Sequence, residues 1–241
     1  MNPHERSPLE SPERGEPNEV DRQLKNTAEQ FVRGDIIKDK KVVHEGDVST
    51  IYACFELPVS LPSISGVNLR LDYRQYHASG GQGKDQVRFE FTAANEKGNH
   101  VPFTEMHLRV VDSRTFDLEH RYVQPEYRNE RAMGSRLLKV AERWLQDVAD
   151  IKQDTVHVFA RVGQKSVMNW LEKNGFSVAK KDEETFRNIK EHPEQYVEDA
   201  VWGSTNPGLS HYLFPQSKAN RSSIDAIRLT FEKKFKPGGA V

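Results

Sequence analysis

The residues best placed to do chemistry lie in one stretch, 122–138, where an apolar strand pattern gives way to a polar loop and then to a helix pattern. The first turn of a helix has unpaired N–H groups and the positive end of the helix dipole. A small residue such as Gly134 lets an anion approach that backbone, and Arg128 and Arg131 could add charge-assisted hydrogen bonds. The stretch therefore predicts an anion site. An ordinary strand-to-helix crossover that exposes arginines is the alternative.

Two segments of the chain resemble the paired motifs of the GNAT superfamily, the acetyl-CoA-dependent N-acetyltransferases. The first resembles motif A and reads Val123-x-Pro125-Glu126-Tyr127-Arg128, then Gly134-Ser135-x-Leu137-Leu138. The second resembles motif B and reads Val158-x-Ala160, Gln164, then Leu171-Glu172-Lys173-Asn174-Gly175-Phe176. The motifs occur in the family's order, and the resemblance covers about residues 85–181 together with the final strand.

The resemblance implies that acetyl-CoA is the cosubstrate. In that family the backbone of the loop wraps the pyrophosphate, and the end of the preceding strand contacts the pantetheine and holds the thioester carbonyl. Carried onto this sequence, the cofactor-binding residues are Tyr122, Val123, Arg128, Asn129, Glu130, Arg131, Ala132, Met133, Gly134, Ser135 and Gln164.

The sequence departs from the family pattern at several positions. Ala132 replaces the middle glycine of the loop, and Asn129 stands at the usual Gln/Arg position unless Arg128 keeps that role in a loop one residue longer. Gln164 stands where the family often has Asn. Leu171 replaces the Tyr that often protonates the leaving thiolate, and leucine has no proton to donate. A GNAT-like module that binds coenzyme A without turnover is therefore the alternative to an active enzyme.

Acetyl transfer to an amine also needs a base that removes a proton from the nucleophile. Asp117 and Glu119 are two residues apart in a strand pattern and so share a face, and we favour Glu119 slightly. His120 points to the other face by alternation, and histidine ordinarily exchanges protons near neutral pH. Each of these residues could equally be a solvated or ion-paired strand residue.

Composition narrows the class of protein. The net charge of −1 over 241 residues gives no field that favours nucleic acid or an anionic membrane, so a transferase acting on charged tRNA is the weakest alternative. Cys54 is the only cysteine and the histidines lack ligand spacing, so we predict that the protein holds no metal. Without a signal-like or membrane-spanning segment, we expect a cytoplasmic monomer or homodimer whose acceptor is a small-molecule or peptide amine.

The elements that must position these residues follow from hydrophobic periodicity. Alternation predicts strands upstream of residue 124, amphipathic helices follow, and residues 155–160 should pair in parallel with 116–123 because a helix crosses between them. The fold class is α/β (α+β), a GNAT-like mixed central sheet flanked by helices, with an atypical strand-rich N-terminal part. The predicted parts are a disordered tail at 1–26, a strand-rich part at 27–84, the acetyl-CoA-binding core at 85–181, a helical or loop insertion at 182–222, a final strand at 223–236 and a tail at 237–241.

Overall fold

The computed structural model describes residues 18–38, 41–46, 49–61, 64–76, 85–127, 132–192 and 229–239. The helices are α1 (Glu19–Arg33), α2 (Met133–Lys152), α3 (Lys165–Lys173) and α4 (Glu183–Glu191), with 3₁₀ turns at Pro125–Tyr127 and Lys180–Asp182. The strands are β1 (Lys41–Gly46), β2 (Ser49–Leu61), β3 (Ile64–Tyr76), β4 (Asp85–Ala94), β5 (His100–Asp112), β6 (Thr115–Val123), β7 (Val156–Val162), β8 (Ser177–Val178) and β9 (Leu229–Phe235).

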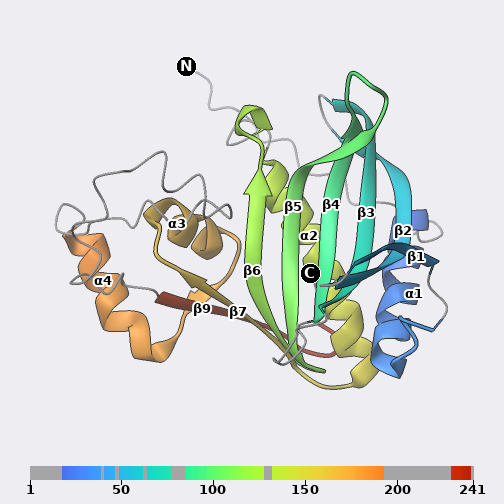
Figure 1. Ribbon diagram of the computed structural model, residues 1–241. Helices are drawn as coiled ribbons and strands as arrows, with labels where there is room; N and C mark the ends of the chain where they lie inside the picture. The colour runs from blue at the N-terminus through green and yellow to red at the C-terminus, as the bar shows by residue number, and fades with distance from the viewer. Residues whose placement is uncertain are drawn as a thin grey trace, which may run out of the picture.

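All of these strands join one mixed sheet in the order β1-β2-β3-β4-β5-β6-β7-β9-β8 (Figure 1). Strands β1 to β6 form an antiparallel meander, whereas β6 and β7 are parallel and are connected through α2. The predicted parallel pair and the α/β class are confirmed. The strand-rich N-terminal part adds β1–β3 to the same sheet as the motif-bearing strands.

Helices α1 and α2 pack against each other and cover one face of this sheet (Figure 1). The core lies beneath them and centres on Trp144 of α2, which is completely buried. Its ring packs edge-on against Phe31, Phe89 and Phe116, at centroid distances of 5.3, 6.0 and 5.7 Å. These aromatic contacts join α1, α2, β4 and β6 into one unit.

Helix α1 begins inside the segment that the sequence predicted to be disordered. Asn18 caps it by accepting a hydrogen bond from the Asp21 N–H at 2.9 Å, and Gly34 ends it at φ 71°. Residues 19–26 are therefore helical, and the predicted disordered tail at 1–26 was wrong at its C-terminal boundary. The cap and the buried Leu24, Thr27 and Ala28 explain why a segment of low hydropathy is ordered.

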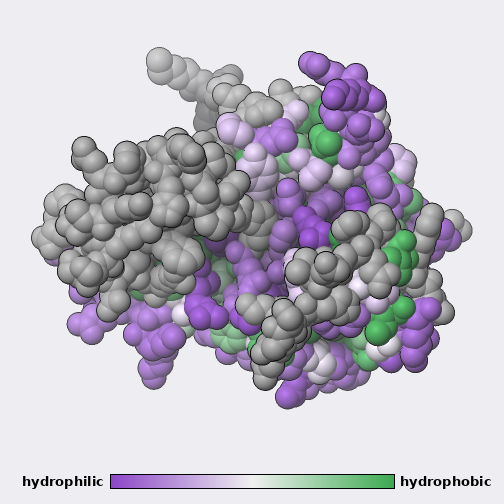
Figure 2. All heavy atoms as spheres, in the orientation of Figure 1, coloured by the Kyte–Doolittle hydropathy of each residue, from purple (hydrophilic) through white to green (hydrophobic). Residues whose placement is uncertain are grey.

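The opposite face of the sheet is charged. Because Phe89 points toward α2, its neighbours Arg88 and Glu90 point to this second face, where Asp72, Gln86 and Asp117 also lie. Figure 2 shows hydrophilic residues across the middle of this face. Carboxylates and arginines lose hydration without gaining partners when an apolar layer covers them. This face of the sheet is therefore suited to contact with a polar ligand or with solvent.

The C-terminal parts of the prediction are described incompletely. Helix α4 lies in the predicted insertion at 182–222, and β9 lies in the predicted final strand at 223–236. Residues 193–228 fall outside the described part of the chain. Among the described residues, no helix is long and apolar enough to cross a membrane.

Candidate functional site

The sheet opens between β6 and β7, which are the one parallel pair among the described strands. They pair through Thr115–Asp117 and His157–Phe159, and no pairing between them follows in the described residues. Strand β6 continues to Val123 along β5, and β7 continues to Val162 along β9 (Figure 1). Within the described residues, the result is an edge without a strand partner on β6 at 118–122 and another on β7 at 160–162. Both edges lie toward the carboxyl ends of the strands, where open α/β sheets bind ligands.

The N-terminus of α2 lies directly beside the unpaired edge of β6. A Cβ atom on Gly134 would stand only 3.2 Å from Cγ2 of Val123, the last residue of β6. Glycine therefore allows the first turn of α2 to lie against the strand end. The N-cap residue is Ala132, which has no polar side chain to accept the first-turn N–H groups. The predicted Met133, Gly134 and Ser135 thus place an uncapped, positively polarised helix end at this edge.

Helix α3 begins at the end of β7, beside the same divergence. Its N-cap Gln164 makes no side-chain capping bond, and its carbonyl accepts the Met168 N–H at 2.9 Å. Trp170 of α3 donates from Nε1 to Ser135 Oγ at 2.9 Å, and Asn174 donates to the same oxygen at 3.4 Å. Ser135 therefore ties α2 to α3. Leu171 is completely buried in the core.

The structure describes the cofactor-binding prediction only in part. Arg128, Asn129, Glu130 and Arg131 lie outside the described residues. Tyr122 is half-buried on the charged face of the sheet, where it pairs with Glu105, and Val123 lies on the α2 face against Gly134. The described members of the set therefore come from β6 and from the starts of α2 and α3, which meet at one end of the sheet.

Asp117 and Glu119 share the charged face, as predicted, and a single arginine links them. Arg109 contacts Asp117 Oδ2 through Nη2 at 2.6 Å and Glu119 Oε1 through Nε at 2.6 Å. Arg161 adds a second contact to Asp117 at 3.1 Å. Asp117 is buried, whereas Glu119 is exposed and also accepts a hydrogen bond from Gln86 at 3.0 Å. Asp117 is thus held in an ion-pair network, and Glu119 is the carboxylate that solvent or a substrate can reach.

A bulge in β6 explains this arrangement. His107 pairs with His120, but the next residue, Leu108, pairs with Leu118, so Glu119 is the extra residue. A bulge turns a side chain away from regular alternation and often marks a site. The side chain of His120 lies outside the described set, so its predicted orientation stays a prediction.

Arg121 is a residue that sequence reasoning missed. It lies two positions before Val123 and pairs with the buried Met106, which places it on the α2 face. Its Nη1 atom is buried and has no hydrogen-bond partner among the described residues. Burial lowers the pKa of Arg121 to about 10, and attraction by Asp117 opposes this shift. Strict alternation from Phe116 and Leu118 would place Arg121 on the same face as Asp117 and Glu119, so only the bulge reveals its position on the α2 face.

Two further surface features are a charged cluster on β4 and β5 and a hollow at the far end of α2. Glu90, Glu105 and His107 bring their polar atoms within 4.8 Å of one another. Arg88 contacts all three, at 2.8, 3.0 and 2.8 Å, and so fills the position that a cation would take.

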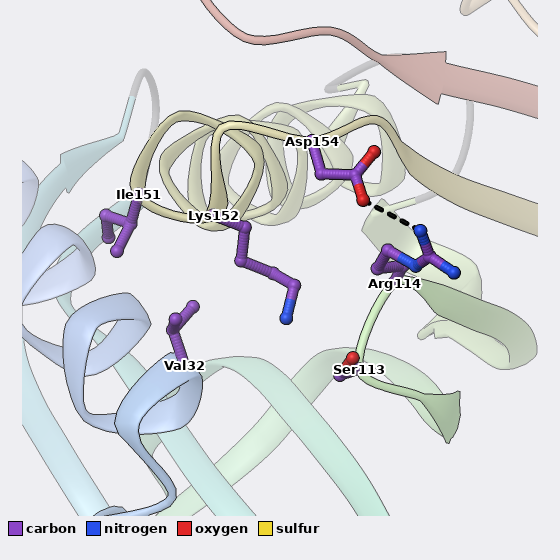
Figure 3. A pocket seen from close by; sticks show the side chains of 6 residues that line it. All are labelled: Val32, Ser113, Arg114, Ile151, Lys152 and Asp154. Carbon is purple, nitrogen blue, oxygen red and sulfur yellow. Dashed lines mark hydrogen bonds and ion pairs between the residues drawn. The ribbon is translucent and has the colours of Figure 1, made fainter.

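A hollow of about 570 Å³ lies at the far end of α2 (Figure 3). The Lys152 amine points into it, and Arg114 pairs there with Asp154 at 2.7 Å.

Comparison with known proteins gives distant structural similarity. A protein described as an acyl-CoA N-acyltransferase from Klebsiella pneumoniae is 11% identical over 62% of this chain and 72% of its own, with a TM-score of 0.33. An acetyltransferase from Streptococcus agalactiae is 15% identical over 61% and 66%, with a TM-score of 0.33. A protein described as a streptothricin acetyltransferase from Bacillus anthracis, in complex with acetyl coenzyme A, is 13% identical over 80% and 100%, with a TM-score of 0.37. No family model and no curated protein sequence matches the chain.

Proposed function

We propose that this chain transfers an acyl group from a coenzyme A thioester, acetyl-CoA being the one that the sequence predicts, directly to a primary amine. The observation that carries the proposal is the divergence of β6 and β7 beside the N-terminus of α2. This arrangement offers a helix end for the pyrophosphate and an unpaired strand edge for the pantetheine arm. Val123, Gly134 and Ser135 of the sequence motif lie beside this divergence, which supports the proposal.

The unpaired edge of β6 supplies the chemistry that the thioester needs. The amide groups of pantetheine can pair with backbone groups of 118–122, on the side of β6 that has no strand partner in the described part of the chain, as an added strand would. A backbone N–H on the same edge can donate to the thioester carbonyl and stabilise the oxyanion of the tetrahedral intermediate. The positive end of α2 then holds the pyrophosphate.

Glu119 is the residue that we propose as the proton acceptor. The amine attacks the thioester carbon, its proton passes to the Glu119 carboxylate, the C–N bond forms and the C–S bond breaks. Coenzyme A leaves as a thiolate and takes up a proton from solvent, because Leu171 has none to give. Asp117 and Arg109 position this carboxylate and do not react.

The test is the steady-state rate of free-thiol release with a panel of amines. We expect Glu119→Gln to lower kcat/KM by about 10²-fold or more, as loss of a general base does. Glu56→Gln is the matched control, since Glu56 is an exposed carboxylate on β2 of the same sheet. Equal rates in Glu119→Gln and the control would remove Glu119 from the mechanism.

A binding module without turnover is the second candidate. It is favoured by Leu171, which is buried where the family pattern has a proton donor. Thiol release at the rate of spontaneous thioester hydrolysis with every amine, together with tight binding of coenzyme A, would identify it.

A further inference from the structure

The side chain of Gln86 joins the proposed proton acceptor to a tyrosine. Gln86 lies on β4, and only 9% of it is exposed. Its Nε2 donates to Glu119 Oε2 at 3.0 Å, and its Oε1 accepts a hydrogen bond from the Tyr76 hydroxyl at 3.0 Å. Arg74 in turn donates from Nη1 to the Tyr76 oxygen at 3.4 Å. The four side chains form a continuous series of hydrogen bonds that starts on β3, passes through β4 and ends on β6.

The two ends of this series fix its direction. A guanidinium can only donate hydrogen bonds, and a carboxylate can only accept them. Because Arg74 donates to the Tyr76 oxygen, the Tyr76 hydrogen is directed to Gln86 Oε1. The amide nitrogen of Gln86 is then left for Glu119, whereas a flipped amide would set its oxygen against the carboxylate. The network of partners therefore holds the Gln86 amide in the orientation that donates to Glu119.

Gln86 makes the directional contact to the Glu119 carboxylate. Arg109 Nε lies 2.6 Å from the other oxygen, Oε1, but this nitrogen has no hydrogen-bond partner among the described residues. The Arg109 contact is thus an ion pair without hydrogen-bond geometry, and Arg109 shares its charge with Asp117. Since hydrogen-bond strength depends on direction, the Gln86 amide is the group that sets the orientation of the Glu119 carboxylate.

The register of the strands shows that this contact depends on two long side chains. Gln86 pairs with Arg109 of β5, and Arg109 pairs with Asp117 of β6. Gln86 therefore reaches Glu119 across the intervening strand β5, over two strand spacings, which is roughly 10 Å. An amide on a shorter side chain would fall short of the carboxylate.

We propose that Gln86 is a positioning residue for acyl transfer: its amide orients the Glu119 carboxylate that receives the proton of the amine, and Tyr76 and Arg74 orient the amide. The inference rests on the proposed function and adds to its machinery. The proton passes from the amine to Glu119, the C–N bond forms and the C–S bond breaks, while Gln86 keeps both of its amide hydrogens.

The experiment is the pH profile of thiol release by the full-length protein and by Gln86→Met, a variant of similar size that has no hydrogen to donate. Above the acidic limb, kcat should fall about tenfold, the effect of one lost buried hydrogen bond. KM for the thioester should stay unchanged, because the proposed coenzyme A site lies at the start of α2. The acidic limb of kcat/KM should move to higher pH, because a carboxylate that loses an N–H donor takes up a proton more readily. Arg109 and Asp117 face Glu119 in both proteins, so the movement reports on Gln86 alone.

Two milder variants keep the test decisive if Gln86→Met does not fold. Gln86→Asn retains the amide but is one carbon shorter, so it should lose the contact to Glu119 and behave like the methionine variant. Tyr76→Phe removes only the hydroxyl that orients Gln86 and should lower kcat about two- to fivefold.

The chain offers matched controls on the opposite face of the sheet. The Tyr52 hydroxyl donates to Gln75 Oε1 at 3.3 Å, and Gln75 follows Arg74 in the regular register of β3. Gln75→Met and Tyr52→Phe therefore remove the same kind of hydrogen bond away from Glu119. Both should retain kcat within about twofold and leave the acidic limb in place.

Each result bears on a distinct claim. Equal values of kcat in Gln86→Met and Gln75→Met, or a lower kcat with an unmoved acidic limb, overturn the assignment of Gln86 and leave the proposed function standing. Failure of the unmodified protein to release thiol with any amine overturns the proposed function and this inference with it.

Discussion

At the scale of single residues, the buried carboxylate of Asp147 is an electrostatically unfavourable feature of the fold. Asp147 on α2 is buried, its Oδ2 atom has no hydrogen-bond partner among the described residues, and Arg143 approaches the carboxylate only to 3.9 Å. Burial raises the pKa of Asp147 to about 6, and Arg143 opposes the shift in part. Asp147 is thus an ionisable residue that the core accommodates at a cost.

The raised pKa of Asp147 makes stability depend on pH. The folded state binds the proton more tightly than the unfolded state, so the favourable contribution is complete below pH 4 and is lost as pH rises through about 6. We expect Asp147→Asn to raise the free energy of unfolding by about 1–2 kcal/mol at pH 8, with no gain below pH 4. Urea unfolding at both pH values measures this. The control is Glu96→Gln in an exposed turn, and a gain of equal size at both pH values would contradict the explanation.

At the scale of elements, α2 is held at both ends by residues in left-handed backbone conformation. Ala132 at its N-cap has φ 49°, and Gln153 at its C-cap has φ 53°. Non-glycine residues rarely adopt this conformation, and alanine does so at a cost of roughly 1 kcal/mol. Ala132 is the position where the family pattern has a glycine, so the structure gives a backbone reason for that glycine.

We therefore expect Ala132→Gly to stabilise the protein by about 0.5–1 kcal/mol in urea unfolding, since relief of the strain exceeds the entropy that glycine adds to the unfolded chain. Gln153→Gly is the matched control at the other end of the helix and should stabilise by a similar amount. Only Ala132→Gly should also tighten coenzyme A binding, because it acts on the loop beside the predicted pyrophosphate. A loss of stability in Ala132→Gly would exclude the strained conformation.

The elements around the divergence could be predicted from sequence, whereas the burial of its charges could not. Period-two and helical patterns identified β6, α2 and β7, because each buries one face and its residues repeat accordingly. The same patterns treated Asp117 and Arg121 as ordinary strand positions. Their roles depend on the bulge at Glu119 and on arginines from β5 and β7, which only the three-dimensional register brings together.

Helix α1 was mispredicted for a similar reason. Its segment has few apolar residues, so composition favoured disorder for 1–26. An N-cap, a C-terminal glycine and a narrow buried stripe are sufficient because Phe31 packs on Trp144 and Phe116, contacts that no local pattern reveals.

At the scale of the whole molecule, the sheet divides the protein into two faces with different tasks. Helices α1 and α2 cover an aromatic core on one side, and a charged surface forms the other (Figures 1 and 2). The divergence of β6 and β7 joins the two sides: the donor would enter along the α2 end, and Glu119 lies where an amine could arrive from the charged face. Donor and acceptor would then meet from opposite faces of the sheet.

The measurement that tests this account most directly is isothermal titration of the full-length protein with desulfo-CoA, acetyl-CoA and ATP, repeated on Gly134→Asp and Gly134→Ala. The account predicts micromolar binding of both coenzyme A forms and none of ATP. Gly134→Asp should abolish the binding, because it places a carboxylate at the helix end against Val123, while Gly134→Ala should weaken it far less. Absence of coenzyme A binding to the unmodified protein, or undiminished binding to Gly134→Asp, would contradict the site.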